Sequence, residues 1–182
     1  YGWYYSCMKI TIIYNERPSN MDRHDPSLEK FIEGDEIKTI EALGNAIKSN
    51  NHQVSYLKID KNIYHKLEEN RQNIDLLFNF AEGIGVGSDR EAQIPMLAEI
   101  LGIKLTGPGP LSAALILNKS RAKEIWKANG VRTAKWQLFT SSYEKMIKEL
   151  TFPLIVKPNS EGSGIGIKSS SIVRSSKELK SA

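Results

Sequence analysis

Residues 74–101 read IDLLFNFAEGIGVGSDREAQIPMLAEIL, a strand pattern followed by a helix pattern. The stretch opens with the apolar run at residues 74–80, which suits a buried strand. Apolar residues then recur at the spacing of one helical face: Ile94, Leu97, Ala98 and Leu101. A buried strand that leads into an amphipathic helix is half of a βαβ unit. The stretch therefore predicts a parallel sheet with helices on its faces.

The same alternation extends on both sides of this stretch. The run KITIIY at residues 9–14 and the run at residues 54–59 predict two more strands, and a further strand is expected near Lys104. Apolar residues on one helical face predict a helix over residues 37–47, and Ile63 and Leu67 mark a shorter helix. We therefore expect all four strands to lie in one parallel sheet.

A different pattern begins near Asn118. Residues 111–128 are consistent with a single helix that Gly130 ends. Three more strands are expected, at residues 135–139, 154–157 and 165–168. Capping boxes that begin at Ser141 and Ser175 predict two further helices. We expect a first domain over residues 8–117 and the start of a second over residues 118–182, with residues 1–7 before Met8 as a non-native tail.

Composition excludes several classes of protein. The chain of 182 residues is 40% hydrophobic and 25% charged, so it can bury a core and is not expected to be disordered. Its 25 basic and 21 acidic residues form no basic block, which argues against a nucleic-acid partner. No apolar run has membrane-spanning length, and a single cysteine, Cys7, cannot form an intramolecular disulfide. These features predict a cytoplasmic protein.

The stretch FPLIVKPNSEGSGIGI at residues 152–167 is the most informative for chemistry. A buried strand there delivers Lys157 into a turn rich in serine and glycine. Glycines let backbone amides approach phosphate oxygens, and Ser163 adds a hydroxyl donor. The glycines are Gly162, Gly164 and Gly166. Taken alone, the same turn also suits a structural hairpin, and the absence of a following Gly-Lys-Ser/Thr argues against a P-loop.

Two other segments carry candidate residues. NKSRAKEIWKANGVRTAKW at residues 118–136 places Lys119 at a helix start, where a solvated surface lysine is the alternative interpretation. GIGVGSDRE at residues 83–91 lacks both the spacing and the position of a dinucleotide fingerprint. Within it, Asp89 and Arg90 contact substrate or stabilise the helix start. His24, His52 and His65 show no metal-ligand spacing.

Over residues 76–168 the chain resembles the D-alanine:D-alanine ligase family. The similarity rests on LLFNFAEGIGVGSDREAQIPMLAEILGIKLTGPGPLSAALILNKSRAKEIWKANGVRTAKW followed by FPLIVKPNSEGSGIGI, in the same order and spacing. It implies an α/β fold: a Rossmann-like pre-ATP-grasp domain with a parallel sheet, followed by the first, incomplete α+β subdomain of an ATP-grasp fold.

The resemblance also implies an activity. ATP phosphorylates an amino-acid carboxylate, a second amino acid's amine attacks the acyl phosphate, and Mg²⁺ assists, as in peptidoglycan and cell-wall synthesis. By resemblance, Lys119 and Lys157 hold the ATP phosphates, and Ser163 also lies near the acceptor amino acid. The loop that closes over the phosphates consists of Glu161, Gly162, Ser163, Gly164 and Gly166. The implied partners are ATP and small amino acids, and a homodimer through the N-terminal domain is expected.

Three departures from the family pattern leave the substrate open. The sequence YNERPSN at residues 14–20 replaces the usual Gly-Gly-x-Ser-x-Glu, and Glu16 is its nearest carboxylate. Glu82 of FAEG stands where the family has a histidine. The family's metal ligands are expected downstream of Ala182, with none in this chain, so an inactive or incomplete fragment is expected. The alternatives are an ATP-grasp ligase for another carboxylate or amine, and a non-catalytic nucleotide-binding module.

Overall fold

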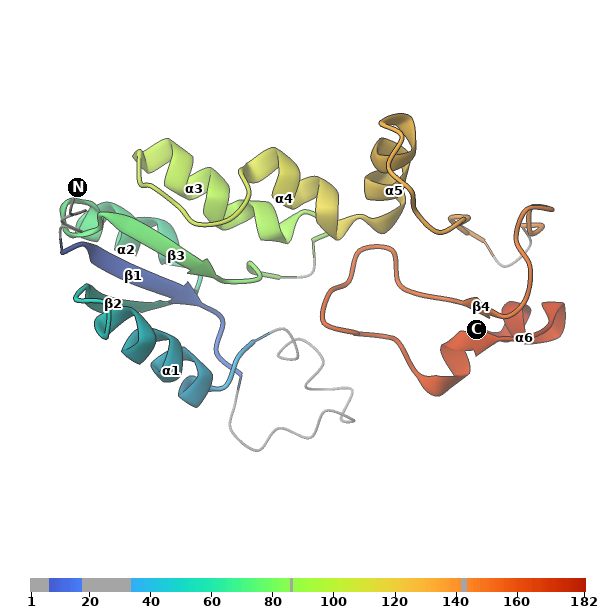
Figure 1. Ribbon diagram of the computed structural model, residues 1–182, viewed down its shortest axis with the longest axis horizontal. Helices are drawn as coiled ribbons and strands as arrows, with labels where there is room; N and C mark the ends of the chain where they lie inside the picture. Colours follow the sequence, from blue (N-terminus) through green and yellow to red (C-terminus); the bar gives the residue numbers. More distant parts are fainter. Residues whose placement is uncertain (1–6, 18–33, 86, 142–143) are drawn as a thin grey trace, which may run out of the picture. The chain divides into compact units, whose positions relative to one another are not determined.

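The computed structural model describes residues 7–17, 34–85, 87–141 and 144–182 (Figure 1). Most of the expected tail at residues 1–7, and His24, lie outside these ranges. The chain divides into two compact units, the first ending at Ala114 and the second beginning at Leu115. In the described part of the chain, no helix has the length and apolar character needed to span a bilayer.

The first unit is built on the parallel sheet that the sequence predicts. Strands β1 (Lys9–Tyr14), β2 (Gln53–Lys58) and β3 (Leu76–Phe80) lie in the order β2-β1-β3. Both neighbours of β1 run parallel to it, with Ile12 paired to Tyr56 on one side and to Phe78 on the other. The three predicted strands and their parallel direction are therefore confirmed.

The fourth predicted strand, near Lys104, is reduced to one parallel bridge between Leu77 and Leu105. The Leu77 N–H donates to the Lys104 carbonyl at 2.8 Å, and the Thr106 N–H donates to the Leu77 carbonyl at 3.0 Å. Pairing does not continue, because the next residues are Gly107-Pro108-Gly109-Pro110 and proline has no N–H to donate.

Helices cover both faces of the sheet, and the alternation of side chains along β1 divides the core in two. Ile13 packs with residues of α2 (Ile63–Asn70) and α3 (Gln93–Leu101). Ile12 and Tyr14 pack with Ile40 of α1 (Ile37–Lys48). Short 3₁₀ turns, η2 (Arg71–Asn73) and η3 (Arg90–Ala92), precede β3 and α3. Burial on both faces explains why β1 is a continuous apolar run.

The helix start predicted at Lys119 is confirmed, but a single helix over residues 111–128 is wrong, because the chain forms two helices there. They are α4 (Pro110–Leu117) and α5 (Lys119–Ala128). Asn118 lies between them in an extended conformation, with φ −84° and ψ 96°, and its side chain accepts from the Arg121 N–H. An asparagine that caps one helix cannot continue the preceding one, so it separates the two.

The strand predicted at residues 154–157 is confirmed only as β4 (Leu154–Ile155), which pairs antiparallel with β5 (Ile172–Val173). The strand predicted at residues 165–168 is wrong. The Ile165 N–H donates to the Gly162 carbonyl and the Ile167 N–H to the Gly164 carbonyl, so this segment forms successive turns. The turn η4 (Ser169–Ser171) then leads into β5.

Residues 135–139 do not form the predicted strand. The side chain of Gln137 donates to the Lys145 carbonyl at 2.9 Å and accepts from the Ile147 N–H at 2.8 Å. The Gln137 side chain thus makes two hydrogen bonds to backbone groups that could otherwise pair with a neighbouring strand.

Of the two predicted capping boxes, the one at Ser175 is confirmed only for its serine, since the described backbone bond to the Glu178 carboxylate comes from the Arg174 N–H. Ser175 accepts from the Glu178 N–H at 3.2 Å at the start of α6 (Ser176–Ser181), and Glu178 accepts from the Arg174 N–H. The box at Ser141 includes residues 142–143, which lie outside the described ranges. The described residues 144–150 after it contain no helix. There the Glu144 carboxylate accepts from both the N–H and the hydroxyl of Thr140.

Candidate functional site

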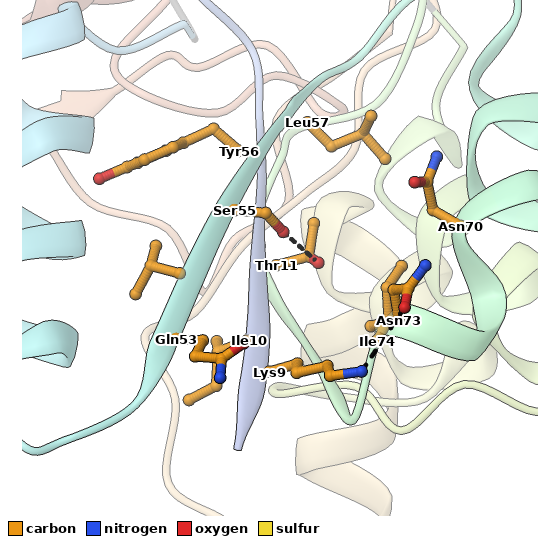
Figure 2. Close-up of a pocket in the computed structure, with 11 residues that line it drawn as sticks. Lys9, Ile10, Thr11, Gln53, Ser55, Tyr56, Leu57, Asn70, Asn73 and Ile74 are labelled. Carbon is orange, nitrogen blue, oxygen red and sulfur yellow. Dashed lines mark hydrogen bonds between the residues drawn. The ribbon is translucent and has the colours of Figure 1, made fainter. Parts of the chain in front are cut away.

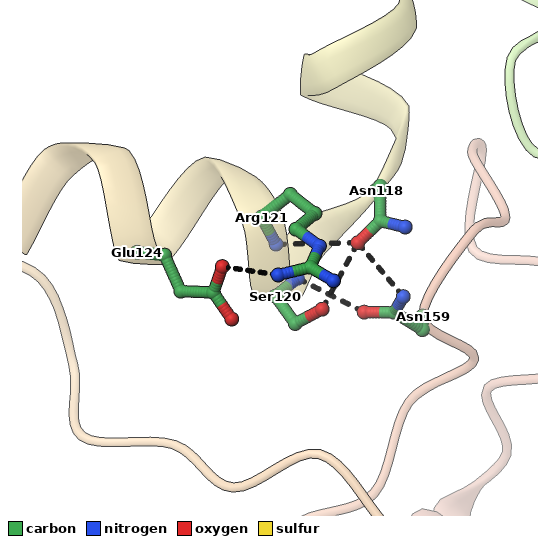
Figure 3. Close-up of polar contacts among 5 residues, drawn as sticks. All are labelled: Asn118, Ser120, Arg121, Glu124 and Asn159. Carbon is green, nitrogen blue, oxygen red and sulfur yellow. Dashed lines mark hydrogen bonds and ion pairs between the residues drawn. The ribbon is translucent and has the colours of Figure 1, made fainter. Parts of the chain in front are cut away.

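In the second unit, the start of α5 lies against the loop that follows β4 (Figure 3). The Lys119 N–H donates to the Asn159 carbonyl and the Ser120 N–H to the Asn159 side-chain oxygen, each at 2.9 Å. The Lys119 ammonium donates to the Glu161 carbonyl, 42 positions further along the chain. The structure therefore brings together two of the residues predicted to bind phosphate, Lys119 and Glu161.

The turn after Glu161 has an unusual backbone. Ser163, Gly164 and Gly166 have φ values of 48°, 78° and 70°. Glycine adopts this left-handed region readily, whereas Ser163 is strained there. A Cβ on Gly166 would lie 2.7 Å from Cγ of Pro158, so this position also needs glycine for packing. Such a turn lets a bound group approach the backbone closely, as the sequence predicts for phosphate.

Lys157 follows β4 and is exposed. The preceding Val156 N–H donates to the Ser171 carbonyl at 2.8 Å, which fixes the backbone at this point. Among the contacts that the structure describes, Lys157 is not part of the cluster of Lys119 and Glu161. Its predicted role in phosphate binding stays a prediction.

The donor set in this unit suits a polyphosphate. It offers two ammonium groups, the Ser163 hydroxyl and a glycine-rich backbone, and phosphate oxygens are acceptors for all three kinds of donor. It does not suit Mg²⁺, which prefers carboxylate oxygens. Within the described ranges, no three side chains of the His, Cys, Asp and Glu types lie close enough together to hold a metal ion.

A second candidate region lies at the carboxyl edge of the sheet in the first unit. The Asn15 side chain accepts from the Glu82 N–H at 2.8 Å and donates to the Gly83 carbonyl at 2.9 Å. It thereby joins the segments that follow β1 and β3. These strands flank the topological switch point of the sheet, where parallel α/β sheets bind ligands. Sequence reasoning missed Asn15, although it is the first polar residue after a buried strand.

Glu16 lies at the same edge and forms an ion pair with the last residue of β2. Its carboxylate forms an ion pair with the Lys58 ammonium at 2.6 Å. The hydrogen bond to Glu16 raises the pKa of Lys58, so this lysine stays protonated. Burial, and next the charge of Glu16, raise the pKa of the Tyr14 phenol. A substrate ammonium at Glu16 would therefore compete with Lys58.

The remaining predicted substrate residues differ in exposure. Asp89 is exposed, Glu82 is half-buried, and Arg90 is 2% exposed. The Arg90 guanidinium donates to the Gly87 carbonyl at 3.2 Å. A Cβ on Gly83 would lie 2.2 Å from the Arg90 carbonyl oxygen, so this loop packs closely on itself. Arg90 thus contributes to the shape of the loop, and contact of any of the three residues with substrate stays a prediction.

A groove of about 530 Å³ lies beside the first half of β1 and most of β2 (Figure 2). The nearly buried Thr11 hydroxyl is hydrogen-bonded there to the Ser55 hydroxyl at 2.7 Å. None of the predicted site residues lines this groove.

We expect Asn15→Ala to lower the free energy of unfolding by about 1–3 kcal/mol, because two half-buried backbone groups lose their partner. Ser49→Ala removes an exposed hydrogen bond from the Ser49 hydroxyl to the Ala46 carbonyl, and we expect it to cost less than about 1 kcal/mol because both residues are exposed. Urea unfolding followed by circular dichroism measures both. Equal losses in the two variants would show that Asn15 is no more than an ordinary surface contact.

Comparison with known proteins gives consistent matches. Residues 125–182 match a family model described as D-ala D-ala ligase C-terminus. A D-alanine–D-alanine ligase of Aquifex aeolicus (strain VF5) is 36% identical over 145 residues, which cover 79% of this chain and 47% of the relative. One of Acidovorax ebreus (strain TPSY) is 45% identical over 71 residues, which cover 38% of this chain and 21% of the relative.

Solved structures agree with these matches. The crystal structure of D-alanine–D-alanine ligase from Bacillus anthracis complexed with ATP has a TM-score of 0.67 at 26% identity, covering 96% of this chain and 53% of that one. VanG D-Ala:D-Ser ligase from Enterococcus faecalis shares the fold, with a TM-score of 0.61 at 19% identity, covering 96% and 58%. The predicted α/β fold is confirmed. The chain spans about half the length of the two solved proteins and no more than half of the two curated relatives.

Proposed function

This chain belongs to the D-alanine–D-alanine ligase family, and we propose that the whole protein joins an amino-acid carboxylate to an amine with the use of ATP. The observation that carries the proposal is the contact between the Lys119 ammonium and the Glu161 carbonyl. It places a cation from a helix start on a glycine-rich turn. Cations and close backbone donors are what a transferred phosphoryl group needs around it.

In this proposal, the candidate site residues of the second unit bind or orient ATP. Lys119 and Lys157 neutralise phosphate charge, and the turn at residues 161–166 approaches the β- and γ-phosphates. Ser163 adds a hydroxyl near the acceptor amino acid. When bound, ATP supplies the phosphoryl group that turns a carboxylate into an acyl phosphate. No step of the proposal runs through a metal ion, because the described residues do not suit Mg²⁺.

The carboxyl edge of the first unit is proposed to hold the amino-acid substrate. Glu16 and Glu82 are carboxylates that attract an ammonium group, and Asp89 and Arg90 lie on the following loop. The second candidate function, ligation of a different carboxylate or amine, is favoured by one observation. Glu16 forms an ion pair with Lys58 at 2.6 Å, so a substrate ammonium at this carboxylate would have to displace the lysine.

Three further elements of the proposal concern the whole protein. It works in the cytoplasm, where ATP and free amino acids are available, and it contributes to peptidoglycan synthesis. It forms a homodimer through its N-terminal domain. The 182-residue chain alone is expected to show no turnover, since two lysines and one turn supply only part of the contacts that orient a phosphoryl transfer.

The test is an assay of the whole protein with ATP, Mg²⁺ and a panel of D- and L-amino acids. Phosphate release and dipeptide formation are measured together, beside the 182-residue chain. We expect phosphate release that depends on an amino acid. Turnover with amino acids other than D-alanine would support the second candidate. ATP binding without phosphate release under any condition would contradict the ligase and support a non-catalytic nucleotide-binding module.

A further inference from the structure

We propose that Asn118 and Asn159 are positioning residues, whose paired side chains hold the phosphate-binding turn at a fixed place against the start of α5. The proposal rests on the proposed function, because it assigns these residues to the binding of ATP. Neither residue touches the phosphates in this account. They act through Lys119 and the turn at residues 161–166.

The donors and acceptors of the pair are fixed by their neighbours (Figure 3). The Ser120 N–H can only donate, so the Asn159 atom that faces it at 2.9 Å is the amide oxygen. The Asn159 amide nitrogen then faces Oδ1 of Asn118, also at 2.9 Å, and donates to it. The same Asn118 oxygen accepts from the Ser120 hydroxyl at 2.9 Å and from the Arg121 N–H at 3.2 Å.

In these contacts, the backbone N–H groups at the start of α5 are hydrogen-bonded within the chain. The N–H groups of Lys119, Ser120 and Arg121 donate, in that order, to the Asn159 carbonyl, the Asn159 side chain and the Asn118 side chain. Such groups commonly bind phosphate directly at helix N-termini. Here the chain's own loop takes them. The helix start therefore serves as the anchor of the turn, and phosphate binding is left to the lysines and the turn.

The anchor determines where the turn begins. Asn159 is two residues before Glu161, whose carbonyl accepts from the Lys119 ammonium. Three bonds thus join α5 to Asn159 and Glu161, on both sides of Ser160. A turn that is held in place before ATP arrives loses less conformational entropy on binding. Loss of the pair should therefore weaken ATP binding and leave the amino-acid sites unaffected.

The asymmetry of the pair provides a sharp test, because both residues can be changed to an isosteric acid. Asn159→Asp replaces the donating amide with a carboxylate oxygen that faces another oxygen. Asn118→Asp keeps every bond described above, since Asn118 only accepts in them, and aspartate is a good helix cap. Both variants add one negative charge at nearly the same place. The difference in ATP affinity between the two variants therefore reports the loss of the hydrogen bond, separated from the effect of the added charge.

The measurement is the dissociation constant of ATP for the whole protein by calorimetry, with KM for ATP and for amino acids measured alongside. We expect Asn159→Asp to weaken ATP binding about tenfold more than Asn118→Asp does, with KM for amino acids unchanged. Asn159→Ala, which breaks the pair without adding charge, keeps the test valid if the acid variant does not fold. It should also weaken ATP binding about tenfold, with KM for amino acids unchanged.

Several outcomes would overturn the proposal. Equal weakening in both acid variants would show that charge alone is responsible. ATP binding that is unchanged in Asn159→Ala would show that the turn needs no anchor. A parallel loss of ATP binding, amino-acid binding and melting temperature would show a merely structural role. Failure of the wild-type protein to bind ATP would contradict the proposed function itself. The wild-type measurement alone separates this outcome from a failure of the positioning proposal.

Discussion

In the whole protein, we expect Lys157→Met to lower kcat/KM for ATP by about 100-fold or more, because it removes the positive charge that the proposed site directs at the phosphates. Methionine keeps the length of the side chain. Lys157 is exposed and follows the short strand β4, so the fold should remain intact. Steady-state kinetics at varied ATP concentrations measure the effect, and Lys119→Ala should act in the same direction.

Lys177→Met is the matched control for this variant. Lys177 is an exposed lysine of the same unit, in α6, and has no proposed role in the site. A general effect of charge on ATP would lower kcat/KM in both variants. We expect the control to stay within about twofold of the wild type, since exposed lysines are mostly inert. Unchanged kinetics in Lys157→Met would remove this residue from the proposed site.

Leu77→Ala should lower the free energy of unfolding of the chain by about 2–5 kcal/mol. Leu77 is 0% exposed and lies in the core cluster with Ile13 and Leu67. Its backbone also carries the only described pairing to the segment at Leu105. Truncation removes buried methyl groups and leaves a cavity where β3 meets its covering helices. A loss of this size is a large fraction of typical domain stability.

Leu111→Ala is the control, because Leu111 is 73% exposed. We expect a change within about 0.5 kcal/mol for this substitution. Urea unfolding followed by circular dichroism compares the two variants with the wild type. Equal stability of all three proteins would contradict the assignment of Leu77 to the core.

The elements that could be predicted from the sequence are those that local pattern determines. β1 and β3 are mostly apolar runs, and α1 and α3 carry apolar residues at helical spacing, so burial and periodicity agree. Their parallel arrangement follows from the alternation of strands and helices. The helix cap at Ser175 is equally local, since its bond from the Glu178 N–H spans three residues.

The second unit was predicted less well because its backbone depends on distant side chains. The Gln137 side chain forms hydrogen bonds with the backbone of Lys145 and Ile147, where a neighbouring strand was expected. No periodicity in the sequence indicates these bonds. The break at Asn118 carried a readable signal, a capping residue, but the apolar pattern on both sides concealed it. Residues 165–168 look like a strand by composition, whereas Gly164 and Gly166 have positive φ and form turns.

The same distinction holds for the candidate site. Lys119 and the glycine turn can be recognised from sequence because their residue types suit phosphate. The asparagines that join its segments, Asn15, Asn118 and Asn159, cannot be recognised in this way. Asn159 meets Asn118 across 41 positions, and Asn15 meets Glu82 across 67. Side-chain amides serve both as donors and as acceptors, so their partners become evident only when the fold brings the segments together.

The most direct test of ligation through an acyl phosphate follows the oxygen atoms. An amino acid labelled with ¹⁸O in its carboxylate is incubated with the whole protein and ATP, and the released phosphate is analysed by mass spectrometry. If the carboxylate attacks the γ-phosphorus and an amine then displaces phosphate, one carboxylate oxygen leaves with each phosphate. We predict one ¹⁸O in each phosphate released per bond formed. Phosphate free of label, alongside dipeptide formation, would contradict the account.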